Sequence, residues 1–131
     1  MQLLLDTHTL MWYNEDDTNL SSNARSFINN RDNDVFVSVA SFYEMAVKIN
    51  IGKLQMNNPL KQFYWQTINA QIEILPVSES YLTNYIALPF FPEHKDPFDR
   101  LIIATAIAGN FTIVSIDKKF DLYKHLVNIV W

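Results

Sequence analysis

Four acidic residues stand where their carboxylates could act together on a metal ion. Asp6 and Asp117 each directly follow a short apolar run, whereas Glu44 and Asp99 each fall near the start of a helical pattern. Carboxylates brought close together repel one another, and a divalent cation compensates their charge. Oxygen ligands in a chain without cysteine favour Mg²⁺ or Mn²⁺ over zinc. Such ions activate water and stabilise displacement at a phosphodiester, so the acids predict nuclease chemistry.

The elements that would position these acids are short apolar runs alternating with helical patterns. The predicted strands are Gln2–Leu5, Val35–Ser38, Glu73–Leu75, Thr112–Ile116 and Val127–Val130. The predicted helices are Ser22–Asn29, Phe42–Ile51, Leu60–Ala70, Ser78–Leu88 and Pro97–Ala108, the last closing at a left-handed Gly109. Continuous apolar strands are typical of a sheet covered on both faces, and alternation with helices favours parallel pairing. We therefore predict an α/β fold, a single domain over residues 1–131, forming a three-layer α/β/α sandwich with a mainly parallel sheet of four to five strands.

This architecture would bring the acids to one edge of the sheet. The carboxyl ends of parallel strands share an edge, and ligands bind there where the strand order reverses. Asp6, Glu44 and Asp117 follow three different strands, and Asp99 joins them if its helix starts at the same edge.

Two of the acids also have ordinary structural explanations. Asp6 could start a turn or cap the next segment. Ser41 and Glu44 match the spacing of a capping box, in which the glutamate satisfies a helix terminus. Either residue alone is therefore a weak signal.

The other two acids are equally ambiguous when taken singly. Asp96 could cap a helix whose first turn contains Asp99. Asp117 could form a surface pair with a neighbouring lysine, such as Lys118. Only the shared position of the four acids after strands raises them above these alternatives.

Composition and charge limit the remaining function classes. Two glycines exclude a glycine-rich phosphate loop. The formal net charge of −4 is accounted for by the four acids, so it is a weak objection to a nucleic-acid partner. No segment reads as a signal peptide or reaches the length of a membrane helix, which leads us to expect a cytoplasmic protein without a membrane partner.

The segments around the acids resemble the motifs of the PIN-domain family, particularly its VapC-like toxins of toxin–antitoxin pairs. The resemblance is carried, in family order, by LLDTHTL at 4–10, SVASFYEMAVK at 38–48 with IGKL at 51–54, HKDPFDRLIIA at 94–104 and IVSID at 113–117. It spans nearly the whole chain. Departures are mild: Ser115 stands where threonine is common, and Met45 and Val47 replace more usual isoleucines.

The resemblance implies a Mg²⁺- or Mn²⁺-dependent endoribonuclease, a hydrolase that is often a homodimer and is inhibited by a cognate antitoxin protein. It implies that the catalytic metal ligands are Asp6, Glu44, Asp99 and Asp117. It also implies an accessory acid at Asp96 and supporting hydroxyls at Thr7 and Ser115.

Basic and imidazole side chains flank these motifs. Lys95, Arg100 and Lys118 could bind RNA phosphates, with Arg100 favoured because it adjoins the Asp99 motif. Solvated surface charge is the alternative for each. His8 and His94 could be metal ligands, although neutral histidines in loops are commoner.

Two other function classes remain open. A non-catalytic interaction module on the same fold would keep the acids only as helix caps, and it would cleave no RNA. A phosphatase or receiver domain using Asp6 as phosphate acceptor fits poorly, because the phosphatase motif needs a second aspartate where His8 stands.

Overall fold

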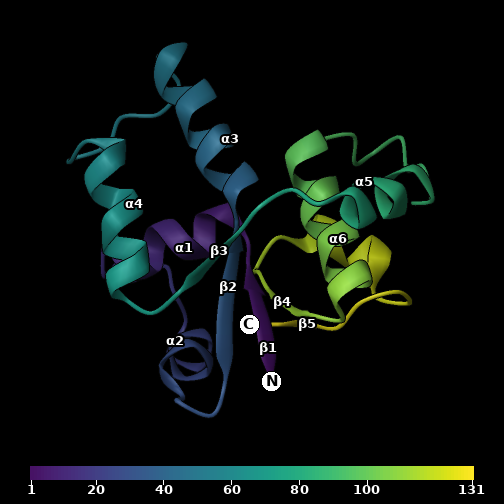
Figure 1. Cartoon of the computed structure of the whole chain (residues 1–131), viewed down its shortest axis with the longest axis horizontal. Helices are drawn as coiled ribbons and strands as arrows, with labels where there is room; N and C mark the ends of the chain where they lie inside the picture. The colour runs from purple at the N-terminus through teal and green to yellow at the C-terminus, as the bar shows by residue number, and fades with distance from the viewer.

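Five short strands form one parallel sheet through the centre of the molecule (Figure 1). The computed structural model describes residues 1–131. The strands are β1 (Gln2–Leu5), β2 (Asp34–Ser38), β3 (Glu73–Leu75), β4 (Thr112–Val114) and β5 (Ile129–Val130). They are ordered β3-β2-β1-β4-β5, and every pairing is parallel. The predicted parallel sheet is confirmed, and its order reverses between β1 and β4.

Helices cover both faces of this sheet. Figure 1 shows on one side α1 (Thr7–Asn14), α2 (Ser22–Asn29), α3 (Val39–Asn50) and α4 (Leu60–Asn69), and on the other α5 (Glu79–Ile86), α6 (Pro97–Gly109) and the 3₁₀ helix η1 (Lys118–Tyr123). Successive residues of β1 supply opposite cores: Leu3 and Leu5 belong to the first, Leu4 to the second. All three are fully buried. The three-layer α/β/α prediction is therefore confirmed.

Local side-chain caps shift several boundaries from the predicted ones. Helix α1, which was not predicted, starts at Thr7 because Asp6 caps it. Helix α3 starts directly after β2, three residues before the predicted Phe42, because Ser38 Oγ accepts a hydrogen bond from Ala40 N at 3.1 Å. The fourth strand ends two residues before the predicted Ile116.

The end of α6 differs from the prediction, and the difference shows why a glycine stands at position 109. The left-handed residue is Asn110, with φ of 55°, and Gly109 is the last helical residue. A Cβ atom at position 109 would lie 2.1 Å from the ring of Phe111. Glycine is therefore required here by close packing and not by backbone conformation.

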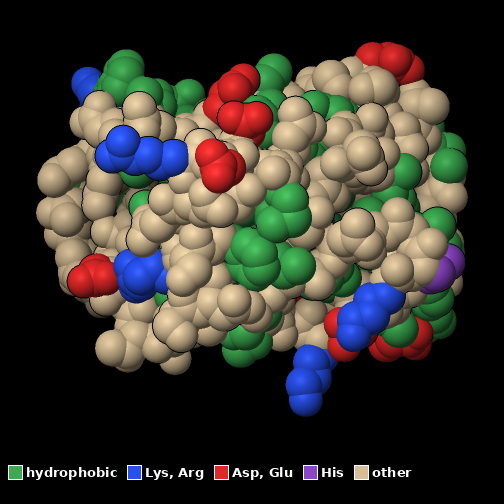
Figure 2. All heavy atoms as spheres, turned by 90° about the horizontal axis from the view of Figure 1, so that it is seen from below, with side chains coloured by type: hydrophobic (Ala, Val, Ile, Leu, Met, Phe, Trp, Pro, Cys, Tyr) green, Lys and Arg blue, Asp and Glu red, His purple; other side chains and the backbone are tan.

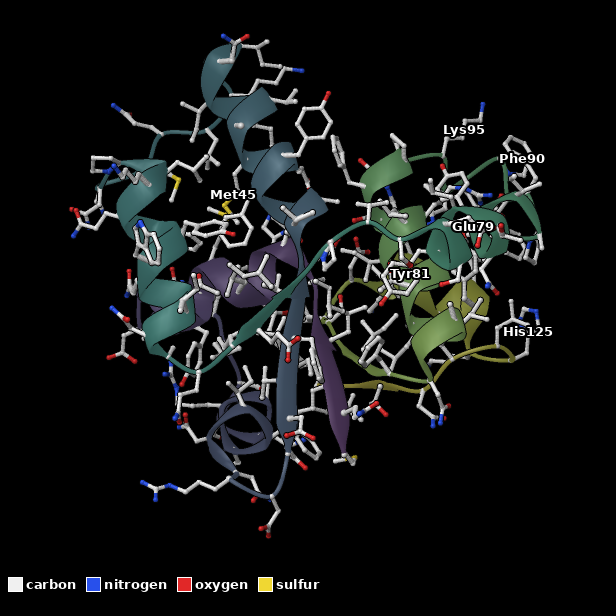
Figure 3. The ribbon with its side chains drawn as sticks, in the orientation of Figure 1. Met45, Glu79, Tyr81, Phe90, Lys95 and His125 are labelled. Atoms are coloured by element: carbon white, nitrogen blue, oxygen red, sulfur yellow. The ribbon has the colours of Figure 1, made fainter.

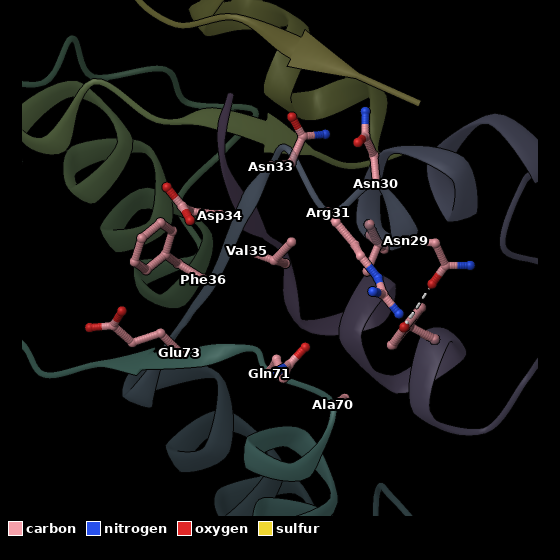
Figure 4. A pocket seen from close by; sticks show the side chains of 12 residues that line it. Asn29, Asn30, Arg31, Asn33, Asp34, Val35, Phe36, Ala70, Gln71 and Glu73 are labelled. Carbon is pink, nitrogen blue, oxygen red and sulfur yellow. Dashed lines mark hydrogen bonds between the residues drawn. The ribbon is translucent and has the colours of Figure 1, made fainter.

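The amino-terminal end of the sheet also carries charged side chains, including Asp34 at the start of β2 and Glu73 at the start of β3. Figure 2 shows this end, with charged side chains of both signs scattered over it. A shallow polar hollow opens beside it between the α2–β2 and α4–β3 connections, lined by Asn29, Asn33, Gln71 and their neighbours (Figure 4). Asn29 Oδ1 already accepts a hydrogen bond from Tyr13, and Asn33 Oδ1 accepts one from the N-terminal amine.

None of the helices combines the length and apolar character that a membrane crossing requires.

Candidate metal and nuclease site

Asp6 lies at the point where β1 ends and α1 begins. Its Oδ1 accepts a hydrogen bond from the backbone N–H of Thr9 at 2.7 Å, which caps α1. Its Oδ2 accepts a hydrogen bond from Ser115, the residue that follows β4. Only 5% of Asp6 is exposed, and burial raises the pKa of its carboxyl against the opposing effect of these two hydrogen bonds. The residue is thus a buried acid beside the reversal of strand order.

Ser115 connects Asp6 to Asp117. Its Oγ donates to Asp6 and accepts a hydrogen bond from the backbone N–H of Asp117 at 3.1 Å. Asp117 then caps η1, because its Oδ1 accepts from the N–H of Lys119 at 2.9 Å. Its side chain is exposed, so Asp117 lies at the outer rim of the site.

Glu44 reaches the same region from the second turn of α3. Its Oε1 accepts a hydrogen bond from Thr7 Oγ1 at 2.8 Å, and its Oε2 pairs with Lys48 Nζ at 2.7 Å. Ser38, not Ser41, caps α3, and Ser41 is a buried helical residue within 3.0 Å of Thr7 Oγ1. The capping-box explanation of Glu44 is therefore wrong. A carboxylate that is only 4% exposed needs another reason to lie here.

Asp99 enters from the start of α6 on the other side of the sheet. The helix is capped by Asp96, whose Oδ1 accepts from the N–H of Asp99 at 2.9 Å, and Pro97 occupies its first turn as predicted. Asp99 Oδ2 lies 3.2 Å from Nε2 of the buried His94. Burial, together with the negative charges of Asp96 and Glu44, raises the pKa of Asp99 to about 6 against the lowering effect of the His94 contact. Asp96 is thus a helix cap as well as a charged neighbour of Asp99.

The four acids share the edge formed by the carboxyl ends of the strands, which we call the carboxyl edge. Ser115 joins Asp6 to Asp117, and Glu44 contacts Thr7, the residue after Asp6, whereas Asp99 is hydrogen-bonded to none of these three acids. Helices α3 and α6 touch above them, with the rings of Tyr43 and Phe98 5.6 Å apart. No three histidine, aspartate or glutamate side chains lie close enough together to hold a metal ion as they stand. The carboxyl edge gathers the acids, and their side chains would have to turn toward one another to share an ion.

The chemistry of these donors fits a hard divalent cation. All four are carboxylates, which suit Mg²⁺ or Mn²⁺. Two of them, Asp6 and Asp99, have pKa values raised by burial, so a cation would relieve a cost that the surrounding protein leaves partly uncompensated. Lys48 is the one cation paired with the acids, and its hydrogen bond to Glu44 raises its own pKa.

Arg100 was predicted to bind RNA phosphates, and the structure gives it another role. The residue is only 6% exposed, and its Nη1 donates to the hydroxyl of Tyr123 at 3.0 Å and to the carbonyl of Pro89 at 3.1 Å. Its guanidinium also lies 5.4 Å from the ring centroid of Tyr85 and 5.9 Å from that of Phe90. The prediction for Arg100 is wrong, because the α5–α6 connection folds over its side chain.

The two lysines of that prediction are placed differently. Lys95 and Lys118 are both exposed, and Figure 3 shows Lys95 pointing outward from the segment before α6.

The two histidines that were considered as metal ligands differ in exposure. His8 is exposed beside the ring of Trp12, with the two ring centroids 5.8 Å apart. His94 is buried against Asp99. The contact between Tyr123 and His94 could not be predicted, because the two residues are 29 positions apart and no local pattern links them.

The raised pKa of Asp99 predicts a definite pH dependence of stability in the metal-free protein. A carboxyl whose pKa is higher in the folded state binds more protons when folded, so its contribution to stability is complete below pH 3.8 and is lost as pH rises through about 6. Over this pH range, the contribution of Asp99 to the free energy of unfolding falls by roughly 3 kcal/mol. Asp99→Asn, which does not titrate, should therefore gain stability relative to the wild type between pH 4 and pH 7. Urea unfolding of both proteins in chelator measures this, and a difference that is flat with pH would contradict it.

Known proteins resemble this chain over nearly its whole length. The model of the PIN domain family matches residues 3–126. Ribonuclease VapC22 of Mycobacterium tuberculosis is 29% identical over 124 residues, which cover 94% of this chain and 92% of that protein.

Solved structures share the fold at lower identity. A chain in the crystal structure of VapBC2 from Rickettsia felis, bound to a DNA fragment from their promoter, superposes with a TM-score of 0.68 at 20% identity, covering 99% of this chain and 98% of that one. A chain of FitAcB from Neisseria gonorrhoeae gives 0.67 at 17% identity, covering 98% and 96%. The family model spans all four acidic motifs and four of the five strands, leaving β5 outside the match. This chain therefore belongs to the PIN domain family.

Proposed function

We propose that this protein is a metal-dependent endoribonuclease and the toxin of a toxin–antitoxin pair. The observation that supports this most is the gathering of four carboxylates at the carboxyl edge of a PIN-family sheet, two of them almost fully buried. Burying a carboxylate is costly unless a positive charge compensates it, and the hydrogen-bond donors to Asp6 are both uncharged, so its position suggests a use. The similarity to Ribonuclease VapC22 supports RNA as the substrate.

In this proposal the metal ligands are Asp6, Glu44, Asp99 and Asp117. A bound Mg²⁺ or Mn²⁺ would lower the pKa of a water molecule and stabilise the charge that develops at the phosphodiester. Ser115 and Thr7 hold the carboxylates of Asp6 and Glu44 through hydrogen bonds that fix their direction.

The remaining polar groups of the site would serve the acids and the RNA. Asp96 fixes the start of α6 and adds negative charge near Asp99. Lys95 and Lys118, exposed beside the acids, would bind RNA phosphates outside the scissile bond.

Removal of the metal is the direct test of this activity. Purified protein should cleave a mixed RNA substrate in Mg²⁺ or Mn²⁺, and excess EDTA should abolish cleavage until either ion is restored. Cleavage that persists unchanged in chelator would refute metal dependence. Absence of cleavage with both ions would favour the non-catalytic interaction module.

The proposed partners follow from the same comparisons. The structural neighbours include toxin–antitoxin complexes, which supports a small antitoxin protein as partner, and we also propose a homodimer acting in the cytoplasm. Expression of the chain alone should arrest growth, and Asp6→Asn should relieve the arrest. Unimpaired growth with soluble, RNA-cleaving protein in the cell would count against the toxin role.

A further inference from the structure

A chain of buried hydrogen bonds runs behind Asp99. His94 Nε2 lies 3.2 Å from Asp99 Oδ2, and His94 Nδ1 lies 3.0 Å from the hydroxyl of Tyr123. That hydroxyl also accepts a hydrogen bond from Arg100 Nη1 at 3.0 Å. His94 is 1% exposed and Tyr123 fully buried, so water cannot replace these contacts.

The direction of each hydrogen bond follows from the groups present. A carboxylate only accepts, so His94 Nε2 must carry the hydrogen that faces Asp99. In neutral imidazole Nδ1 is then an acceptor, and the hydroxyl of Tyr123 must donate to it. The same hydroxyl oxygen accepts from Arg100, which is always charged, so all three bonds point toward Asp99. A charged imidazole would instead leave the hydroxyl hydrogen of Tyr123 without an acceptor.

We propose that His94, fixed as the Nε2–H tautomer by Tyr123 and Arg100, is a positioning residue that orients Asp99 for metal binding. The inference rests on the proposed function, because it assigns Asp99 as a ligand. His94 occupies one oxygen of Asp99 and leaves the carboxylate free to bind an ion through its other lone pairs. Hydrogen bonds from such outer partners fix the geometry of metal ligands, and their loss lowers metal affinity about 10- to 100-fold.

The tautomer can be read without any metal. In the ¹⁵N-histidine-labelled full chain, long-range ¹⁵N–¹H spectra should show His94 protonated at Nε2 and not at Nδ1, with the signals assigned by comparison with His94→Asn. Protonation at Nδ1 would overturn the proposal, because the bond directions would then be reversed.

Two substitutions of His94 separate positioning from packing. The amide nitrogen of glutamine reaches about as far as Nε2, whereas that of asparagine reaches only about as far as Nδ1. His94→Gln should therefore bind Mn²⁺ within about threefold of the wild type, and His94→Asn about tenfold or more weakly. Tyr123→Phe, which keeps the ring and removes the donor to His94, should also weaken Mn²⁺ binding.

Phe120→Leu provides the matched control. Phe120 is buried with its ring 6.0 Å from that of His94, so the change disturbs packing without removing a hydrogen bond. Its Mn²⁺ affinity, measured by calorimetry, should equal that of the wild type. The positioning role would be overturned if all variants bound Mn²⁺ with equal affinity. It would also be overturned if the loss of Mn²⁺ affinity in each variant only followed its loss of thermal stability. A wild type that binds no Mn²⁺ would instead refute the proposed function, and the tautomer measurement would still stand.

Discussion

Asp6→Asn should reduce RNA cleavage by roughly three orders of magnitude while the protein stays folded. The substitution removes one negative charge and one metal ligand, and electrostatic contributions of this kind are worth several kcal/mol in the transition state, at about 1.4 kcal/mol per factor of ten. Asparagine keeps the size of the side chain, and its carbonyl oxygen can still accept from the N–H of Thr9. Because burial raises the pKa of Asp6, the neutral variant should unfold at an equal or higher urea concentration.

Single-turnover cleavage and urea unfolding of the same preparations measure both parts of this expectation. Asp16→Asn is the matched control, since Asp16 is exposed and forms only a peripheral ion pair with Arg25. It should cleave RNA at the wild-type rate. Cleavage by Asp6→Asn at that same rate would remove Asp6 from the site.

Arg100→Met should destabilise the protein by about 3 kcal/mol and should leave in place Lys95 and Lys118, the exposed lysines that we propose to bind phosphate. The substitution removes two hydrogen bonds from a charged donor, each worth roughly 1.5–3 kcal/mol, and leaves the half-buried carbonyl of Pro89 without its partner. Methionine retains part of the apolar stem that packs against Tyr85 and Phe90. Urea unfolding gives the loss of stability directly.

Lys118→Met distinguishes this role from phosphate binding. Lys118 is exposed, so its loss should leave unfolding unchanged and weaken RNA binding several-fold at low salt. If Arg100→Met were as stable as the wild type and only its RNA affinity fell, the buried role assigned to Arg100 would be wrong.

The sheet and α6 could be predicted because their signals are local. Apolar runs bounded by polar residues mark buried strands, and the cap at Asp96 followed by Pro97 marks a helix start. Helix α1 was missed because its buried face includes Thr7 and Thr9, so it lacks an amphipathic apolar pattern. It forms because Asp6 caps it and because Thr9 Oγ1 donates to the carbonyl of Val114 at 2.9 Å, a contact between distant segments.

The candidate site could be predicted only as far as topology determines it. Parallel strands place residues that follow them at one edge, which is why Asp6, Glu44 and Asp117 could be grouped from sequence. Side-chain direction depends on tertiary packing, so the burial of Arg100 could not be derived, and the hydroxyls of Thr7 and Ser115 were expected only from the family resemblance. The contact between His94 and Tyr123 is of this kind.

We propose that carboxylates of the carboxyl edge share a divalent ion. A crystal of the protein grown with Mn²⁺, measured at a wavelength where manganese scatters anomalously, tests it most directly. We expect an anomalous peak coordinated by the carboxylates of Asp6 and Asp99, with Glu44 or Asp117 turned toward it. Manganese bound elsewhere, with these side chains still paired to Ser115, Lys48 and His94, would contradict the claim.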